Sequence, residues 1–437
     1  MSYLFADERR EKLENYFFSK KQDIPKTKHV LLLPPDHTRL YSDAGFLTAY
    51  LYRRFIEEGV EAIIMPALGT HSAMSDAQLE FFFGKDIPKS AFRVHKFRDE
   101  VVTLGSLPSS LIAEISGGKV DYEIPVQINR LLVEGGFDRI ISIGQVVPHE
   151  VAGMANHAKN LWIGVGGEAF INRSHFLGAV CGIESILGQM NSPVRRLFDE
   201  ASARFEKRFS APVDYVLTVV SPIDFQKENV SDGAEVHHTG SGLVVRGLFV
   251  GKGREGFEKA AVLSREVNLD RQSKPLKKAV AWLPPEEFSS CWLGNKAIYR
   301  LRMAMADEGE LVIIAPAVKE FGEDPAIDQL IRKHGYKGTS TILKAVKEDP
   351  ELSKNLSAAA TLIHGSTEGR FRVTYATNPA LLSKEEVESV GFCWMNINDA
   401  EARYGTSPKS VCWRKDAEGE DFFAVPNPAL GLWIADK

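Results

Sequence analysis

The chain has 437 residues, of which 44% are hydrophobic and 25% are charged, and its formal net charge is −5. This length exceeds that of one ordinary domain, and the composition is that of a globular protein with a sizeable core, so we expect two domains. The small negative charge gives no reason to expect nucleic acid or an anionic membrane as a partner. The four cysteines lie far apart without a CxxC pair, which argues against a disulfide framework and against a thiolate metal site.

The N-terminal segment is a charged, amphipathic helix candidate and differs from a signal peptide. Apolar runs in the chain are all much shorter than the roughly 20 residues that cross a bilayer as a helix. From the sequence we therefore expect a cytoplasmic protein without a membrane partner.

Apolar runs that suit buried strands alternate with helical patterns in the first half of the chain. Each of these runs is short, and polar residues or glycines follow it closely. The predicted strands are residues 29–33, 61–65 and 140–143, and the predicted helices are residues 45–55 and 77–83. This alternation is typical of an α/β domain with a parallel sheet.

The polar stretch 268–278 interrupts this pattern and indicates a domain boundary. Beyond it the α/β pattern resumes, with predicted strands at 278–283 and 311–315 and a predicted helix at 295–306. From residue 373 onward the pattern becomes more β-like.

We therefore predict two α/β domains, residues 1–270 and residues 271–437. Each is expected to be built on a mixed or mostly parallel sheet flanked by helices, with a cleft between the two domains.

Two loops after predicted strands carry residues suited to chemistry. In Asp36-His37-Thr38-Arg39 the arginine is able to hold a carboxylate or phosphate bidentately. A turn in which Asp36 and Thr38 bond the backbone is an equally consistent interpretation of this motif. In Gly69-Thr70-His71 the histidine is a candidate acid or base.

A third stretch, residues 144–175, gathers imidazoles and an amine after the strand at 140–143. Because ligands bind in the loops after strands of α/β folds, these groups suggest proton transfer, metal ligation or covalent attachment of a cofactor. The residues concerned are His149, His157, Lys159 and His175.

Other well-known motifs are missing from this stretch. His149-Glu150 does not continue as HExxH, because Gly153 stands where the second histidine would be, and a metalloprotease is therefore disfavoured. The glycines at 164–167 do not follow GxGxxG, so a conventional NAD dehydrogenase is weakly supported.

Taken together, these motifs resemble the nickel-pincer lactate racemase family of 2-hydroxyacid racemases and epimerases. Four separate motifs occur in the family's order and spacing, mostly within residues 28–265. They are Asp36-x-Thr38-Arg39, Gly69-Thr70-His71, Pro148-His149-x-x-Ala152-Gly153, and Lys159 followed by His175. The resemblance implies that the first domain carries the cofactor and catalytic motifs and that the second completes the substrate cleft.

The resemblance also implies a cofactor, the nickel-pincer nucleotide (pyridinium-3,5-bisthiocarboxylic acid mononucleotide nickel). Lys159 matches the lysine that joins it covalently through a thioamide. His175 matches the ligand that completes the square-planar nickel site, a geometry expected for Ni(II). Thr38, Gly69 and Thr70 match positions that contact the cofactor.

For the substrate, the resemblance implies that His71 and His149 act as base and acid on opposite faces. Arg39 would bind the substrate, and Asp36 would orient neighbouring groups. In this chemistry hydride leaves C2 of the 2-hydroxy acid to give a planar 2-keto acid, which takes hydride back on either face. Two histidines near neutral pKa suit the accompanying proton transfers.

The chain departs from the family pattern mainly at the substrate end. The family's Tyr-Gln-x-x-Lys would fall at residues 299–303, where Arg300 replaces the glutamine and Met303 replaces the lysine. Arg300 and Arg302 are candidate substitutes for binding the substrate, although exchanging one cation for another is not neutral. We therefore expect a substrate other than lactate, with a sugar acid epimerised at C2 (gluconate/mannonate type) as the leading hypothesis.

Partners expected from this reading are the small-molecule hydroxy acid and the enzymes that make the cofactor, while association into a homo-oligomer is left open. Two alternatives remain at this stage. One is a metal-dependent hydrolase or lyase with a zinc ion held by His149, His157 and His175. The other is a hydroxy-acid-binding protein that has lost turnover.

Overall fold

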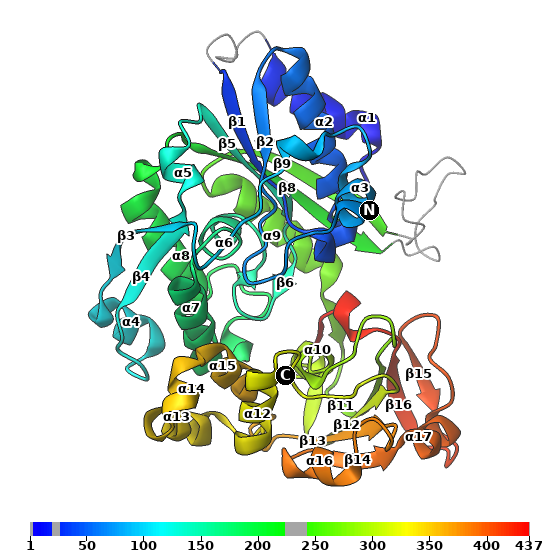
Figure 1. Ribbon diagram of the computed structural model, residues 1–437. Coiled ribbons are helices and arrows are strands. Elements are labelled where there is room, and N and C mark those ends of the chain that lie inside the picture. The colour runs from blue at the N-terminus through cyan, green and yellow to red at the C-terminus, as the bar shows by residue number, and fades with distance from the viewer. Residues whose placement is uncertain (1–2, 20–26, 223–242, 437) are drawn as a thin grey trace. The chain divides into compact units, whose positions relative to one another are not determined.

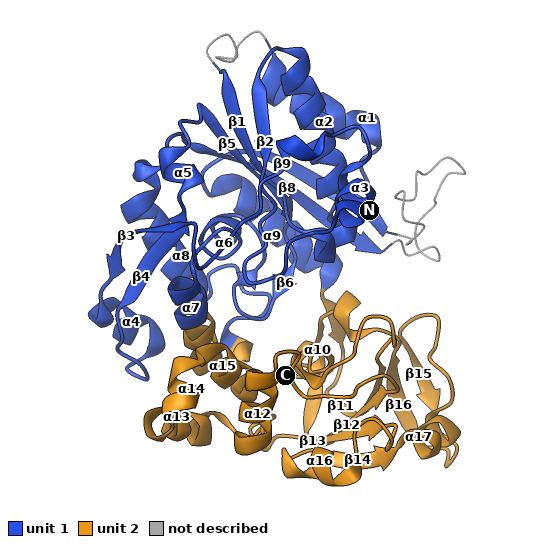
Figure 2. Ribbon diagram, in the orientation of Figure 1, with its two compact units in different colours: residues 1–174, 185–268 blue, residues 175–184, 269–437 orange. Residues whose placement is uncertain are grey.

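The computed structural model describes residues 3–19, 27–222 and 243–436 (Figure 1). The chain divides into two compact units (Figure 2). The first unit comprises residues 1–174 and 185–268, and the second comprises residues 175–184 and 269–437. The sequence places one boundary at 270, whereas in the structure the short segment 175–184 also belongs to the second unit.

The first unit is built on a five-stranded sheet of order β2-β1-β5-β8-β9. Neighbouring strands are parallel except for β8 and β9, which are antiparallel. Two short antiparallel pairs, β3 with β4 and β6 with β7, lie outside this sheet. The strands are β1 (His29–Leu33), β2 (Glu61–Ile64), β3 (Val101–Leu107), β4 (Ile124–Asn129), β5 (Arg139–Gln145), β6 (Pro148–His149), β7 (Gly153–Met154), β8 (Val213–Pro222) and β9 (Leu243–Lys252).

Both faces of this sheet are covered. Side chains alternate between the two faces of a strand, and in β1 Val30 and Leu32 join one apolar cluster while Leu31 and Leu33 are also fully buried. This is why β1 is a continuous apolar run in the sequence.

The helices of the first unit are α1 (Ala6–Leu13), α2 (Ala44–Glu57), α3 (Asp76–Phe83), α4 (Ser109–Ser116), α5 (Leu131–Glu134), α6 (Ala158–Trp162), α7 (Glu168–Cys181, which runs into the second unit), α8 (Pro193–Phe205) and α9 (Glu255–Asn268).

The second unit contains a six-stranded sheet of order β14-β13-β12-β11-β16-β15 and a small pair, β10 with β17. Within the six-stranded sheet only β15 and β16 pair in antiparallel fashion. The strands are β10 (Asp270–Gln272), β11 (Leu276–Trp282), β12 (Met305–Ala315), β13 (Arg372–Thr377), β14 (Cys393–Asn396), β15 (Cys412–Lys415), β16 (Asp421–Val425) and β17 (Trp433–Ala435).

The helices of the second unit are α10 (Cys291–Gly294), α11 (Lys296–Leu301), α12 (Pro325–His334), α13 (Thr339–Glu348), α14 (Pro350–Lys354), α15 (Leu356–His364), α16 (Lys384–Ser389) and α17 (Ile397–Tyr404). The predicted helix 295–306 is too long, because β12 already begins at Met305 to pair with β11. The predicted α/β class, with mostly parallel sheets flanked by helices, is confirmed. Among the described residues, no helix combines the length and the apolar composition needed to cross a membrane.

Candidate active site

The predicted site loops of the first unit follow three parallel strands. Since β1, β2 and β5 are parallel neighbours, their C-terminal ends lie at the same edge of the sheet. The loop after β1 holds Asp36 and Arg39, the loop after β2 holds His71, and the chain after β5 leads to His149. The strand order therefore gathers residues that are more than 100 positions apart in the sequence.

Asp36 and His71 form a close pair at this edge. Nδ1 of His71 lies 2.5 Å from Oδ2 of Asp36, and Asp36 is only 3% exposed. The other oxygen, Oδ1, accepts hydrogen bonds from the Thr38 N–H at 3.0 Å and from the Thr38 hydroxyl at 2.5 Å. Burial would raise the pKa of Asp36, but the hydrogen bonds from His71 and Thr38 outweigh it and lower this pKa to about 2. Asp36 is therefore ionised at neutral pH.

This pairing decides which nitrogen of His71 is available. An ionised carboxylate only accepts hydrogen bonds, so Nδ1 of His71 carries a proton. In the neutral ring Nε2 then has a lone pair, and the side chain is 57% exposed. Asp36 thus orients His71 as a base, in the way that a buried aspartate orients the histidine of a catalytic triad.

His37 follows Asp36 directly in the sequence, but its side chain contacts Gln78 of α3. Its Nε2 lies 3.0 Å from Nε2 of Gln78, whose amide N–H is the donor. Gln78 also accepts a hydrogen bond from the Ser75 N–H and so completes the capping box of α3. His37 therefore ties the loop after β1 to α3, and it is oriented by that helix.

His149 lies in the tight hairpin of β6 and β7. Its Nδ1 accepts the backbone N–H groups of Val151 at 3.1 Å and Ala152 at 3.3 Å. Oε2 of Glu150 is 4.0 Å from the same nitrogen, which is too long for a hydrogen bond. The two predicted catalytic histidines therefore differ: Nδ1 is a donor in His71 and an acceptor in His149.

Lys159 lies on α6, near Asp36, Arg39 and Glu150, whose charges all act on its amine. Burial lowers the pKa of Lys159 to about 8, and the positive charge of Arg39 adds to this effect. Among the described residues, no hydrogen bond or ion pair engages the Lys159 amine. An amine that loses its proton this readily and has no competing partner fits covalent attachment of a cofactor.

The backbone before Lys159 is unusual, because Asn156 and His157 both have positive φ, at 62° and 56°. Arg195 of α8 holds this segment: its guanidinium is fully buried and donates to the carbonyl oxygens of Met154 and Asn156. Cation–π contact with Phe257, at 4.4 Å, supports the same guanidinium. The local sequence pattern does not reveal this role, because Arg195 has the surroundings of a surface residue on an amphipathic helix.

Two further contacts fix α6 against the strand ends. The Asn160 amide donates to the Leu33 carbonyl oxygen and to the Ser142 hydroxyl, both at 2.9 Å. The Gly69 N–H donates to the Gly164 carbonyl oxygen at 2.8 Å. The loop that carries His71 and the helix that carries Lys159 are therefore parts of one hydrogen-bonded framework.

His157 is a core residue. Its ring stacks between Tyr215 and Phe257, with ring centroids 4.2 Å and 5.1 Å away, and its Nε2 lies 3.0 Å from the Gly253 carbonyl oxygen. Burial lowers the pKa of His157 to about 3, and the nearby charge of Arg195 adds to this. A role for His157 as a zinc ligand is therefore not favoured.

Residues 11–185 match the lactate racemase N-terminal domain family. The N-terminal part of the chain is therefore similar to the N-terminal domain of lactate racemases. A crystal structure of a Thermotoga maritima protein superposes with a TM-score of 0.80 at 25% identity, covering 100% of this chain and 99% of that one. The lactate racemase apoprotein of Thermoanaerobacterium thermosaccharolyticum has the same fold, with a TM-score of 0.69 at 18% identity over 99% of this chain and 92% of that one. No curated protein matches the sequence.

His175, Arg300 and Arg302, which the sequence also predicts as site residues, lie in the second unit. His175 is on α7, and its role as nickel ligand stays a prediction. Arg302 is 4% exposed, forms an ion pair with Glu184 and donates to the Ser366 carbonyl oxygen, so its guanidinium is already engaged. Arg300 is half-buried on α11. Arg302, one of the two arginines predicted to bind the substrate, therefore has the contacts of a structural residue.

One group of three potential metal ligands lies close together in the described part of the chain, Asp416, Glu418 and Glu420. Arg403 bonds to all three carboxylates, and Lys278 pairs with Asp416 and Glu420. Because Arg403 and Lys278 already occupy these carboxylates, we assign no metal to this group.

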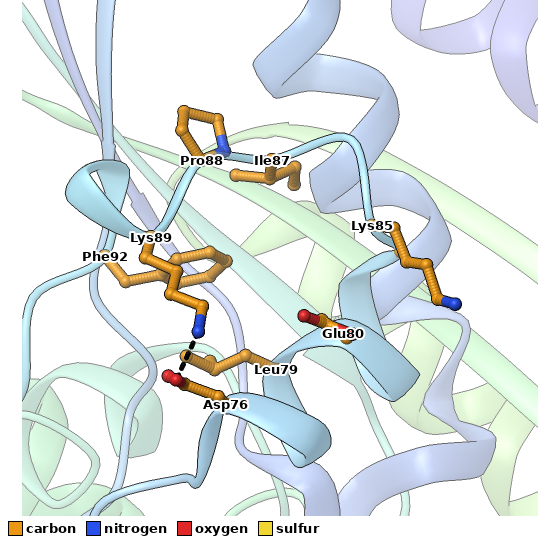
Figure 3. Close-up of a pocket in the computed structure, with 9 residues that line it drawn as sticks. Asp76, Leu79, Glu80, Lys85, Ile87, Pro88, Lys89 and Phe92 are labelled. Carbon is orange, nitrogen blue, oxygen red and sulfur yellow. Dashed lines mark hydrogen bonds and ion pairs between the residues drawn. The ribbon is translucent and has the colours of Figure 1, made fainter.

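A surface pocket lies beside α3 in the first unit (Figure 3). Lys89 forms an ion pair with Asp76 there, and the predicted site residues are not part of its lining. The lining residues are Asp76, Leu79, Glu80, Gly84, Lys85, Ile87, Pro88, Lys89 and Phe92. The pocket is therefore separate from the group around Lys159.

Proposed function

We propose that this lactate racemase-like protein inverts C2 of a 2-hydroxy acid by reversible hydride transfer to a nickel-pincer nucleotide joined to Lys159. The observation that carries the proposal is the Lys159 amine, which has a pKa of about 8 and no partner among the described residues. Arg39 and Asp36 both act on this amine, and Asp36 pairs with His71. A covalent anchor, a cation and an oriented base thus occur together.

When joined to Lys159, the cofactor would supply a reversible hydride acceptor for C2 of the substrate. The protein's own residues position the substrate and move its hydroxyl proton. Arg39 is exposed and has a guanidinium suited to binding the substrate carboxylate bidentately. His71 receives the hydroxyl proton at Nε2, and the ionised Asp36 stabilises the imidazolium that results.

The proposed substrate is a sugar acid of the gluconate/mannonate type. Its support is the altered segment at residues 299–303, where the family's glutamine and lysine are replaced. A sugar acid has more hydroxyl groups than lactate and needs more polar contacts in its binding pocket. A pocket built to hydrogen-bond a hydroxyl group strongly discriminates against substrate analogues that lack this group. Enzymes that make the cofactor are the other proposed partners, and protein produced without them would lack the modification.

Mass spectrometry of the intact protein, co-produced with the cofactor-making enzymes, tests the anchor. We expect one adduct on the wild-type chain and none on Lys159→Arg, which keeps the charge but cannot form the thioamide. Absence of both the adduct and nickel in the wild-type protein would reject the proposal.

The reaction type is tested with a substrate that carries deuterium at C2. Hydride transfer predicts that the epimerised product keeps the deuterium, whereas removal of C2–H as a proton predicts that it exchanges with water. A screen of aldonic acids and short hydroxy acids with cofactor-loaded protein then identifies the substrate. Binding without epimerisation of any acid would instead support the hydroxy-acid-binding protein.

A further inference from the structure

The amide of Asn160, next to Lys159 in α6, has a structural role between β1 and β5. Its nitrogen donates to the Leu33 carbonyl oxygen and to the Ser142 hydroxyl, both at 2.9 Å. A side-chain amide has two N–H bonds, so Asn160 has no donor left for a ligand.

Asn156 lies at the next level between the same two chain segments. An ideal Cβ on Gly144 would lie 2.2 Å from Nδ2 of Asn156 and 3.4 Å from Cδ of Pro35, so the amide nitrogen fills the space that Gly144 leaves open, beside Pro35. Gly144 and Pro35 each come two residues after the partners of Asn160. The Asn156 amide is therefore nearer to the carboxyl edge of the sheet, where the loop with Asp36 begins.

The hydrogen bond of its oxygen fixes the orientation of the Asn156 amide. Oδ1 accepts the backbone N–H of His157 at 2.6 Å, and a backbone N–H only donates, so the atom that faces Gly144 is the nitrogen. Asn156 is 5% exposed, and within the part of the chain that the structure describes Nδ2 has no hydrogen-bond acceptor. A buried amide donor without an acceptor is unfavourable, so the fold retains here a polar group that it does not itself use.

The backbone at Asn156 is strained as well. φ is 62° at Asn156 and 56° at His157, a region that residues other than glycine rarely adopt. Asparagine tolerates this region better than most residues, which accounts for the conformation but not for the unused Nδ2. Strained backbone that its surroundings hold in place is common in ligand-binding segments.

We propose that Asn156 is a further ligand-binding residue of this site, whose Nδ2 donates a hydrogen bond to an oxygen of the bound molecule. This inference rests on the proposed function, which brings two molecules with acceptor oxygens to this edge: the hydroxy acid and the nucleotide joined to Lys159. Asn156 adds a neutral donor to the cation of Arg39. A neutral donor distinguishes ligands by the position of an oxygen and not by their charge.

Nitrogen-15 NMR of asparagine-labelled protein tests this contact. The Asn156 side-chain amide signals, assigned by their loss in Asn156→Gly, are compared in cofactor-free protein, in loaded protein, and in each after addition of lactate or gluconate. A hydrogen bond to a ligand is expected to move an amide proton signal downfield. A shift on loading identifies the group on Lys159 as the acceptor, and a shift only after addition of acid identifies the acid. No shift in any state would overturn the proposal.

The proposed function and this inference fail in different ways. If the intact mass shows no adduct on Lys159, the racemase chemistry is rejected, while addition of acids to cofactor-free protein still tests the donor. If the adduct and epimerisation are both present but the Asn156 signals do not move, only the inference is rejected.

Variants at Asn156 separate the donor from the backbone role. Glycine adopts a φ near 60° without strain, so a residue needed only for the turn would be replaced by it without loss. If Nδ2 binds the ligand, Asn156→Gly should raise KM for the acid or slow cofactor loading by about tenfold. Asn156→Asp keeps the acceptor for the His157 N–H but lacks the donor, and it should lose at least as much.

Glu308→Gly is the matched control for these variants. Glu308 also has a positive φ, at 60°, and it is exposed in the second unit. Its replacement by glycine should leave KM and cofactor loading unchanged. Wild-type KM and wild-type loading in Asn156→Gly would contradict the proposal, because the residue would then serve only the turn.

Discussion

Replacement of Asp36 by asparagine tests the base assigned to His71. In the native protein the carboxylate accepts the Nδ1 proton of His71 at 2.5 Å, and it is buried and ionised. Asparagine has nearly the same shape but no charge, so the imidazolium formed during proton transfer loses its counter-charge. The amide also allows the opposite tautomer, in which Nε2 carries the proton and cannot accept another. We expect kcat to fall by about 10²–10⁴-fold, the contribution typical of a positioned base.

The pKa of Asp36 sets the accompanying change in stability. A decrease from 3.8 to about 2 corresponds to about 2 kcal/mol of preference for the ionised carboxylate in the folded protein. Solvent reaches the His71 side chain, which is 57% exposed, so this value is an upper bound for the pair. Because the folded-state pKa lies below the unfolded one, the stabilisation is present above pH 4 and is lost as the pH falls from about 4 to about 2.

Two measurements check this prediction: kcat for epimerisation as a function of pH, and urea unfolding at pH 7 and at pH 3. The matched control is Asp138→Asn. Asp138 also has a lowered pKa, caused by the N–H groups of Lys28 and His29, but it lies at the opposite end of β1. This control should keep wild-type kcat. Wild-type kcat and an unchanged pH profile in Asp36→Asn would refute the assignment of His71 as the base.

Three further outcomes are expected. The Lys159 amine, with a pKa of about 8, should react with acylating reagents faster than surface lysines between pH 7 and 8, because more of it is neutral there; peptide mapping of cofactor-free protein measures this. Arg195→Met should lower the free energy of unfolding in urea by about 1–3 kcal/mol and reduce cofactor loading, since the Met154 and Asn156 carbonyl oxygens lose their donor. Gly153→Ala should destabilise the protein more than Gly117→Ala does. Both glycines have positive φ (+78° and +65°), but only at Gly153 would the added Cβ meet another backbone atom, 2.1 Å away. Equal thermal unfolding temperatures of the two variants would contradict this prediction.

Sequence periodicity predicts β1, β2 and β5 because each contains a continuous apolar run that becomes largely buried. The predicted runs 29–33 and 61–65 differ from β1 and β2 by at most one residue. The helix predicted at 295–306 fails for a tertiary reason: Met305 pairs with Leu276 of β11, and this contact overrides a local helical pattern. Local pattern alone cannot supply such a pairing.

The same limit applies to the site. His157 and His149 look alike in the sequence, yet the ring of His157 stacks on Tyr215 and Phe257, whose positions depend on the fold. Arg195 gives no local signal because its importance lies in two carbonyl oxygens about 40 residues earlier in the chain. Motif spacing identifies which loops meet, whereas the directions of the Nδ1 hydrogen bonds, which differ between His71 and His149, require the folded backbone.

The charges around Lys159 connect its modification to substrate binding. Before modification, Lys159 and Arg39 are two cations that disfavour one another, and Asp36 and Glu150 partly offset them. Under the proposed function the thioamide bond removes the charge of Lys159 permanently. Arg39 then remains as the exposed cation near this position, while Arg195 is fully buried, so we expect Arg39 to supply most of the attraction for a substrate carboxylate. Arg39→Lys in the loaded protein should therefore weaken binding of the acid, because an ammonium cannot replace the bidentate contact of a guanidinium, whereas cofactor loading should be unaffected.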